Sequence, residues 1–135
     1  MDKLKYFQSY GEKHYSQNKE DGLINEIFNR IGFSNRKGLE MCCGSGSECN
    51  LTNLIINEKL KNTLYIDKNT RAIAKGKLWW EKKLKKNPKI IIPIYENVYI
   101  KRDTINTIIE RHEITGEIDI LSLDMDGIDY WIMKE

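Results

Sequence analysis

Short apolar segments alternate with amphipathic segments along this 135-residue chain, and that order restricts the folds that the chain can adopt. The segments with apolar residues at helical spacing are 20–31, 51–60, 69–86 and 103–112. The segments that fit strands are 37–42, 62–67, 89–100 and 117–124. Strands that alternate with helices form right-handed βαβ units, which build a parallel sheet with helices on its faces. The sequence therefore predicts an α/β fold.

The length and composition fit one domain with one core. The net charge of +2 gives no general attraction to nucleic acid or to an acidic membrane. No apolar run approaches the ~20 residues that a membrane span needs, and the N-terminus lacks the apolar centre of a secretion signal. Three cysteines, an odd number, fit a reducing compartment. We predict a cytoplasmic single domain without nucleic-acid or membrane partners, with an N-terminal extension at 1–19 and a core at 20–135.

Three of the predicted strands end in residues that suit a small-molecule site. The sequence CCGSGS follows the first, Asp67 ends the second, and DMDGID follows the fourth. In parallel sheets, ligands bind outside the carboxyl ends of the strands. Gly44 and Gly46 allow a turn in which the backbone approaches a ligand, and an acid placed like Asp67 can bind ribose hydroxyls. A third loop glycine and a GK[ST] sequence are both lacking, which favours an adenosyl ligand without a pyrophosphate over NAD or ATP.

The cysteines beside this turn could also form a zinc site or a redox pair. Cys42, Cys43 and Cys49 lack the paired C-x2-C spacing of structural zinc sites. Adjacent cysteines rarely meet disulfide geometry without strain. We therefore expect Cys42 and Cys43 to be small packed residues, and Asn50 to cap the helix that follows.

The acidic residues Asp124, Asp126 and Asp129 lie within six positions of one another. Because nearby carboxylates repel each other, at least one is expected to hold a cation, accept from a donor or have a raised pKa. Such oxygen ligands suit Mg²⁺ or Ca²⁺, although no other residue supports a metal, and a carboxylate could equally act as a general base. A solvated turn with Gly127 at its bend is the alternative.

Several blocks in order resemble an FkbM-like family of S-adenosylmethionine-dependent methyltransferases. These blocks, spread over about residues 15–133, are YSQNKEDGLINEIF, GLEMCCGSGSECNLTNLI, LYIDKN, INTII and IDILSLDMDGIDYWI. The resemblance implies a class I, Rossmann-like fold, which is a three-layer sandwich with a mostly parallel sheet. It also implies that Glu40, Gly44 and Gly46 hold the methionine part of the cofactor and that Asp67 binds the ribose. Cys42 occupies the place of the first glycine of the family's loop.

By this resemblance the expected activity is transfer of a methyl group to a small-molecule or sugar hydroxyl, with Asp124 or Asp126 as base or metal ligand. The family's sheet continues beyond the last strand predicted here, so we expect a sheet that is incomplete in its C-terminal half. An unpaired strand edge would result, which favours a homo-oligomer, a marginally stable monomer or a missing C-terminal portion. The alternative is a truncated, non-catalytic Rossmann-like module that binds a nucleoside or a partner.

Overall fold

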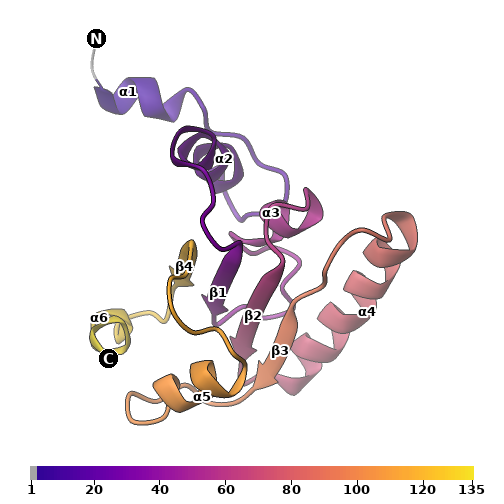
Figure 1. Cartoon of the computed structure of the whole chain (residues 1–135), viewed down its shortest axis with the longest axis vertical. Coiled ribbons are helices and arrows are strands. Elements are labelled where there is room, and N and C mark those ends of the chain that lie inside the picture. Colours follow the sequence, from indigo (N-terminus) through magenta and orange to yellow (C-terminus); the bar gives the residue numbers. More distant parts are fainter. Residues whose placement is uncertain (1–2) are drawn as a thin grey trace.

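The computed structural model describes residues 3–135, and a four-stranded parallel sheet in the order β3-β2-β1-β4 forms its centre (Figure 1). The strands are β1 (Lys37–Met41), β2 (Asn62–Asp67), β3 (Ile94–Asn97) and β4 (Ile120–Leu123). The helices are α1 (Lys3–Gln8), α2 (Glu20–Ile31), α3 (Thr52–Ile56), α4 (Thr70–Lys86), α5 (Ile105–Arg111) and α6 (Asp129–Lys134). The predicted α/β class and the parallel sheet are confirmed.

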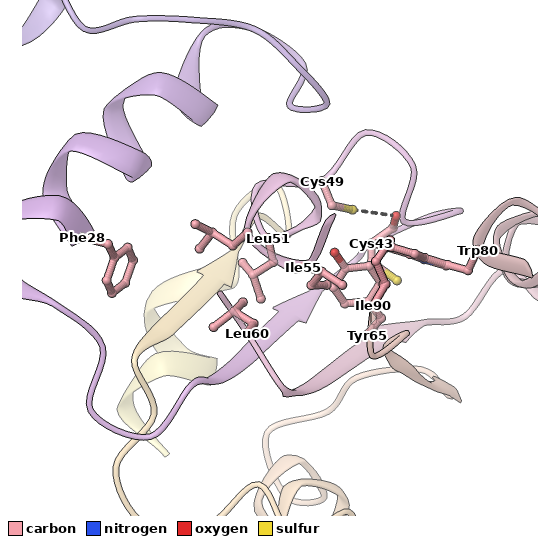
Figure 2. Close-up of a cluster of buried hydrophobic side chains, with 10 residues drawn as sticks. Phe28, Cys43, Cys49, Leu51, Ile55, Leu60, Tyr65, Trp80 and Ile90 are labelled. Carbon is pink, nitrogen blue, oxygen red and sulfur yellow. Dashed lines mark hydrogen bonds between the residues drawn. The ribbon is translucent and has the colours of Figure 1, made fainter. Parts of the chain in front are cut away.

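Alternating side chains of the central strands divide the core into two layers. Tyr65 of β2 belongs to a cluster that includes Leu51, which precedes α3, Ile55 of α3 and Trp80 of α4 (Figure 2). The opposite cluster consists of Leu39, Met41, Leu64 and Ile66 from the strands, packed with Ile100, Ile105, Ile108, Ile114 and Ile132. Helices therefore cover both faces of the sheet, as expected for a Rossmann-like sandwich with an incomplete sheet.

The strand order reverses beside β1. The chain passes from β1 through α3 to β2 and through α4 to β3, and then returns to place β4 on the other side of β1. Glu40 of β1 is consequently in register with Tyr65 of β2 and with Ser122 of β4. At such a reversal the connections leave the two neighbouring strands toward opposite faces, which opens a crevice at their carboxyl ends. The fold thus places a crevice beside Glu40.

Most predicted elements are present, but several are shorter than expected; the strand expected over 117–124, for example, spans only Ile120–Leu123. The helix expected over 51–60 ends at Ile56, and the strand expected over 89–100 pairs only over Ile94–Asn97. Pro93 immediately precedes that strand and has no N–H for a ladder bond. α4 runs the full length expected because the Asn69 side chain accepts from the Ala72 N–H and lysines occupy its last turn. Over residues 3–135, no helix is both long enough and apolar enough to cross a membrane.

Residues 11–18 of the predicted N-terminal extension are fastened to the start of α2. The buried Asp21 carboxylate accepts backbone N–H bonds from His14, Tyr15 and Ser16 at 2.6–2.8 Å. The N–H of Gly22 donates to the Glu12 carbonyl, and a Cβ on this glycine would collide with backbone atoms of the same segment. Three charge-assisted bonds to one oxygen hold the segment firmly against the core.

Candidate functional site

Two adjoining cavities of about 310 Å³ each open at the carboxyl ends of β1 and β4. The glycine-loop cavity is lined by Gln17, Asn18, Glu20, Glu40, Met41, Cys42, Cys43, Gly44, Ser45, Glu48, Cys49, Asn50, Ser122 and Asp124. The Asp67 cavity is lined by Cys42, Asp67, Lys68, Val98, Tyr99, Ile100, Asp124, Met125, Asp126 and Ile128. Cys42 and Asp124 line both cavities, so the two adjoin, and we treat them together as one candidate site.

Glu40 is almost fully buried at the centre of this site. Its carboxylate accepts from the backbone N–H groups of Asn50 and Leu51 at 3.1 and 3.0 Å, and from the Ser122 hydroxyl at 3.1 Å. Burial raises the pKa of Glu40, and these hydrogen bonds oppose the rise without cancelling it. Glu40 thus joins β1 to the turn before α3 and to β4.

The predicted capping role of Asn50 is wrong. Leu51 stands at the N-cap of α3 without a side-chain cap bond, and the Asn50 amide donates to the Ser122 hydroxyl instead. Glu40 instead accepts, from the neighbouring strand β1, the N–H groups of Asn50 and of the N-cap residue Leu51. That arrangement depends on tertiary contacts that the local sequence does not reveal.

The loop after β1 contains three residues in the left-handed backbone region, namely Cys42 (φ 58°), Gly44 (φ 56°) and Gly46 (φ 74°). A Cβ on Gly44 would meet no atom within 4 Å, so this glycine leaves open space in the cavity wall. A Cβ on Gly46 would collide with the Tyr65 ring and the Tyr95 hydroxyl, and Gly46 lines neither cavity. Gly44 therefore faces the site, whereas Gly46 is required for packing beneath it.

Asp67 lies at the end of β2 and lines the second cavity. One carboxylate oxygen accepts from the Gly44 N–H at 2.7 Å, and the other accepts from the Asn69 N–H at 2.7 Å. Each carboxylate oxygen has a second lone pair, so Asp67 retains acceptor capacity toward a ligand. The first of these bonds links the residue predicted to bind ribose directly to the glycine loop.

The three acidic residues near the C-terminus have different roles. Asp124 and Asp126 are exposed and line the site, and Asp126 has a left-handed backbone (φ 55°). Asp129 accepts from the N–H groups of Met125 and Gly127, and these two bonds lower its pKa. The carboxylate of Asp129 therefore stabilises the turn before α6. Among residues 3–135, no group of three or more His, Cys, Asp or Glu side chains could hold a metal ion.

All three cysteines are free thiols in this structure. Cys43 and Cys49 are buried, and the Cys49 thiol donates to the Cys43 carbonyl at 3.1 Å (Figure 2). Burial raises the pKa of both thiols well above the ordinary value, so they remain protonated and unreactive. Cys42 differs from the expected packed residue because it is exposed between the two cavities.

Sequence reasoning missed part of the lining. Val98, Tyr99 and Ile100 form a wall of the Asp67 cavity, although they appeared to be strand material. These residues directly follow the third strand. Because the carboxyl ends of parallel strands lie at one edge of a sheet, that position could have indicated that they line the site. Glu48 was also missed. Gln17 and Asn18, from the segment before α2, line the glycine-loop cavity as well.

The raised pKa of Glu40 predicts a pH-dependent stability. Because protonation is easier in the folded protein than in the unfolded chain, the free energy of unfolding should fall as pH rises from about 4 through the raised pKa. We expect this fall in the wild type and a smaller one in Glu40→Gln, measured by urea unfolding across pH. Glu117→Gln, which removes an exposed carboxylate, is the control and should retain the wild-type slope. An unchanged slope in Glu40→Gln would contradict this assignment.

No protein-family model matches the chain, and no curated protein matches it.

Proposed function

We propose that the two adjoining cavities bind S-adenosylmethionine and that the chain is a methyltransferase domain. The observation that carries the proposal is the pair of adjoining cavities at the strand-order reversal. One is polar and lies beside the glycine loop, and the other is partly apolar and lies beside Asp67. Small-molecule sites in open α/β sheets occupy this position. The sequence resemblance to FkbM-like methyltransferases, which rests partly on the same residues, is the reason for choosing this ligand.

The charge of the lining supports a cationic ligand without phosphates. Glu20, Glu40, Glu48 and Asp124 line the glycine-loop cavity, and that cavity has no lysine or arginine in its wall. Carboxylates favour an ammonium and a sulfonium group, whereas they repel the phosphates of NAD or ATP. In this arrangement Gly44 and Ser45 would lie against the methionine part of the ligand.

The second cavity supports the adenosine part. Asp67 would accept hydrogen bonds from the ribose, and Val98, Tyr99 and Ile100 offer apolar surface for the purine. Cys42 and Asp124, which line both cavities, would then flank the sulfonium centre. Cys42 has a left-handed backbone where glycine is favoured, so its side chain is retained at a conformational cost of about 1 kcal/mol.

Bound S-adenosylmethionine supplies an electrophilic methyl group attached to a positively charged sulfur. The chain would hold the acceptor hydroxyl in line with that methyl carbon. As the new carbon–oxygen bond forms and the sulfur–carbon bond breaks, Asp124 or Asp126 would take the hydroxyl proton. Both carboxylates are exposed to the site and suit an acceptor that enters from solvent. The acceptor class, a small-molecule or sugar hydroxyl, rests on the resemblance alone.

Calorimetric titration with S-adenosylmethionine and S-adenosylhomocysteine tests the cofactor assignment. We expect micromolar binding in the wild type and at least about tenfold weaker binding in Asp67→Ala, because the charged acceptor for the ribose is lost. Asp103→Ala removes an exposed acid outside both cavities and should bind like the wild type. Absence of binding by a folded wild type would refute the cofactor assignment and favour the non-catalytic alternative.

Transfer of labelled methyl from S-adenosylmethionine to a panel of sugars and small alcohols tests the catalytic assignment. Asp124→Asn keeps the shape of the side chain but removes its basicity and its charge, so we expect turnover to fall by about 100-fold or more. Cofactor affinity should also weaken, because Asp124 lines both cavities. Asp126→Asn is the parallel variant, because the two carboxylates are the alternative bases. Full activity in both variants would exclude an aspartate base at this site.

We also propose that a second copy of the chain covers the edge of β4. The opposite edge strand, β3, follows Pro93 and carries Glu96, which pairs with Arg111 and His112. Proline and charge protect an edge from further pairing. β4 has neither between Ile120 and Leu123, and its Leu121 side chain is 41% exposed.

Sedimentation velocity tests this association. The wild type should form dimers that dissociate on dilution, and Leu121→Lys should shift the protein to monomer because a charge opposes pairing at an edge. A compact wild-type monomer that unfolds cooperatively at all concentrations would contradict the proposal. In that case the edge of β4 either remains unpaired in a stable monomer or is covered by a further segment of chain.

A further inference from the structure

The glycine loop rests on a buried layer of aromatic side chains from the strands and from α4. The Tyr95 hydroxyl of β3 donates to the Ser45 carbonyl at 2.6 Å, and the Trp80 indole N–H of α4 donates to the same hydroxyl at 3.0 Å. The rings of Tyr65 and Tyr95 meet edge to face, with centroids 5.6 Å apart. These groups contact the loop from the side opposite the cavity wall formed by Gly44 and Ser45.

The direction of each hydrogen bond in this layer follows from its partners. Trp80 can only donate, so the Tyr95 oxygen accepts from it and the single Tyr95 proton goes to the Ser45 carbonyl. Burial raises the pKa of the Tyr95 hydroxyl, which keeps that proton in place over the physiological range. The Ser45 carbonyl is therefore bound by a donor that is itself polarised by a second donor.

The peptide unit between Ser45 and Gly46 is held from both of its ends. Its carbonyl oxygen accepts from Tyr95, and its N–H donates to the Cys43 carbonyl at 2.8 Å. A second set of bonds holds the next carbonyl, because the Thr52 hydroxyl donates to Gly46 at 2.6 Å and the Tyr65 hydroxyl contacts Thr52 at 2.9 Å. Rotation of the Ser45–Gly46 peptide unit would break both of its hydrogen bonds at once, one to Tyr95 and one to Cys43.

The close contact with α4 requires glycine on the helix. A Cβ on Gly76 would collide with the Ser45 carbonyl oxygen and would lie 2.7 Å from the Tyr95 hydroxyl. A glycine in a helix interior costs stability relative to alanine, so its presence here is explained by the approach of the loop. The loop thus packs against α4 at the position of Gly76, where the helix has no side chain, and it cannot move closer to the helix without a clash.

We propose that Tyr95 is a positioning residue for the candidate site, acting through the Ser45 carbonyl on the loop that forms the cavity wall. Its effect on cofactor affinity rests on the proposed function, whereas its effect on the loop does not. Tyr95 lines neither cavity, so it would influence the ligand without touching it. The hydroxyl of Tyr95, rather than the bulk of its ring, carries this role.

Tyr95→Phe tests the proposal because it removes the hydroxyl and keeps the ring. Hydrogen exchange of the unliganded protein should become at least about fivefold faster in peptides covering 43–48, the factor that one net hydrogen bond contributes. The dissociation constant for S-adenosylhomocysteine should rise by a similar factor, because a looser loop must be ordered on binding. Ile105→Val is the matched control, since it weakens the core on the opposite face of the sheet and leaves the loop contacts intact.

The two measurements separate a positioning role from a merely structural one. If Tyr95→Phe and Ile105→Val lose similar stability and only Tyr95→Phe changes loop exchange and affinity, the proposal is supported. If both variants keep wild-type loop exchange, Tyr95 serves stability alone and the proposal is overturned. If the wild type binds neither ligand, the proposed function fails, and loop exchange alone then decides the role of Tyr95.

Discussion

The buried carboxylate of Glu40 is the interaction on which the geometry of the site depends. It satisfies two backbone N–H groups at the turn before α3 and the hydroxyl of Ser122 on β4. Placing a carboxylate in the interior carries a desolvation cost of several kcal/mol unless hydrogen bonds offset it. The three donors come from both sides of β1, so the carboxylate is stabilised only when β4, β1 and α3 are assembled together.

Two segments of chain border the site around this carboxylate, and different hydrogen bonds hold each of them in place. On one side, Asp21 holds the segment that brings Gln17 and Asn18 to the cavity. On the other, the glycine loop is tied to Asp67 through the Gly44 N–H and to Tyr95 through the Ser45 carbonyl. Hydrogen bonds from the surrounding elements therefore preorganise a crevice, and the charged residues that line its glycine-loop cavity are all acidic. Preorganisation of this kind lowers the ordering cost of binding a small cationic ligand.

Much of the fold could be predicted from the sequence because local periodicity reports local structure. The alternation of apolar and amphipathic segments predicted a parallel sheet, and the strand ends at Cys42, Asp67 and Asp124 were expected at one edge. The limits of α3 and β3 were not predictable to the residue. α3 ends before Glu58, which has a left-handed backbone (φ 59°), and the Lys59 N–H then bonds back to the Leu54 carbonyl. β3 extends only as far as it remains in register with β2.

By itself, the sequence determined the α/β class, the order of the elements and the residues concentrated at one edge of the sheet. Spacing and residue type carry that information, because side chains alternate along strands and recur every few residues along helices. Only the tertiary structure decided that Asp129 stabilises a turn while Asp124 faces the site, and that Gly46 serves packing while Gly44 borders the cavity. These residues are alike in the sequence, and the contacts that distinguish them come from segments brought together by folding.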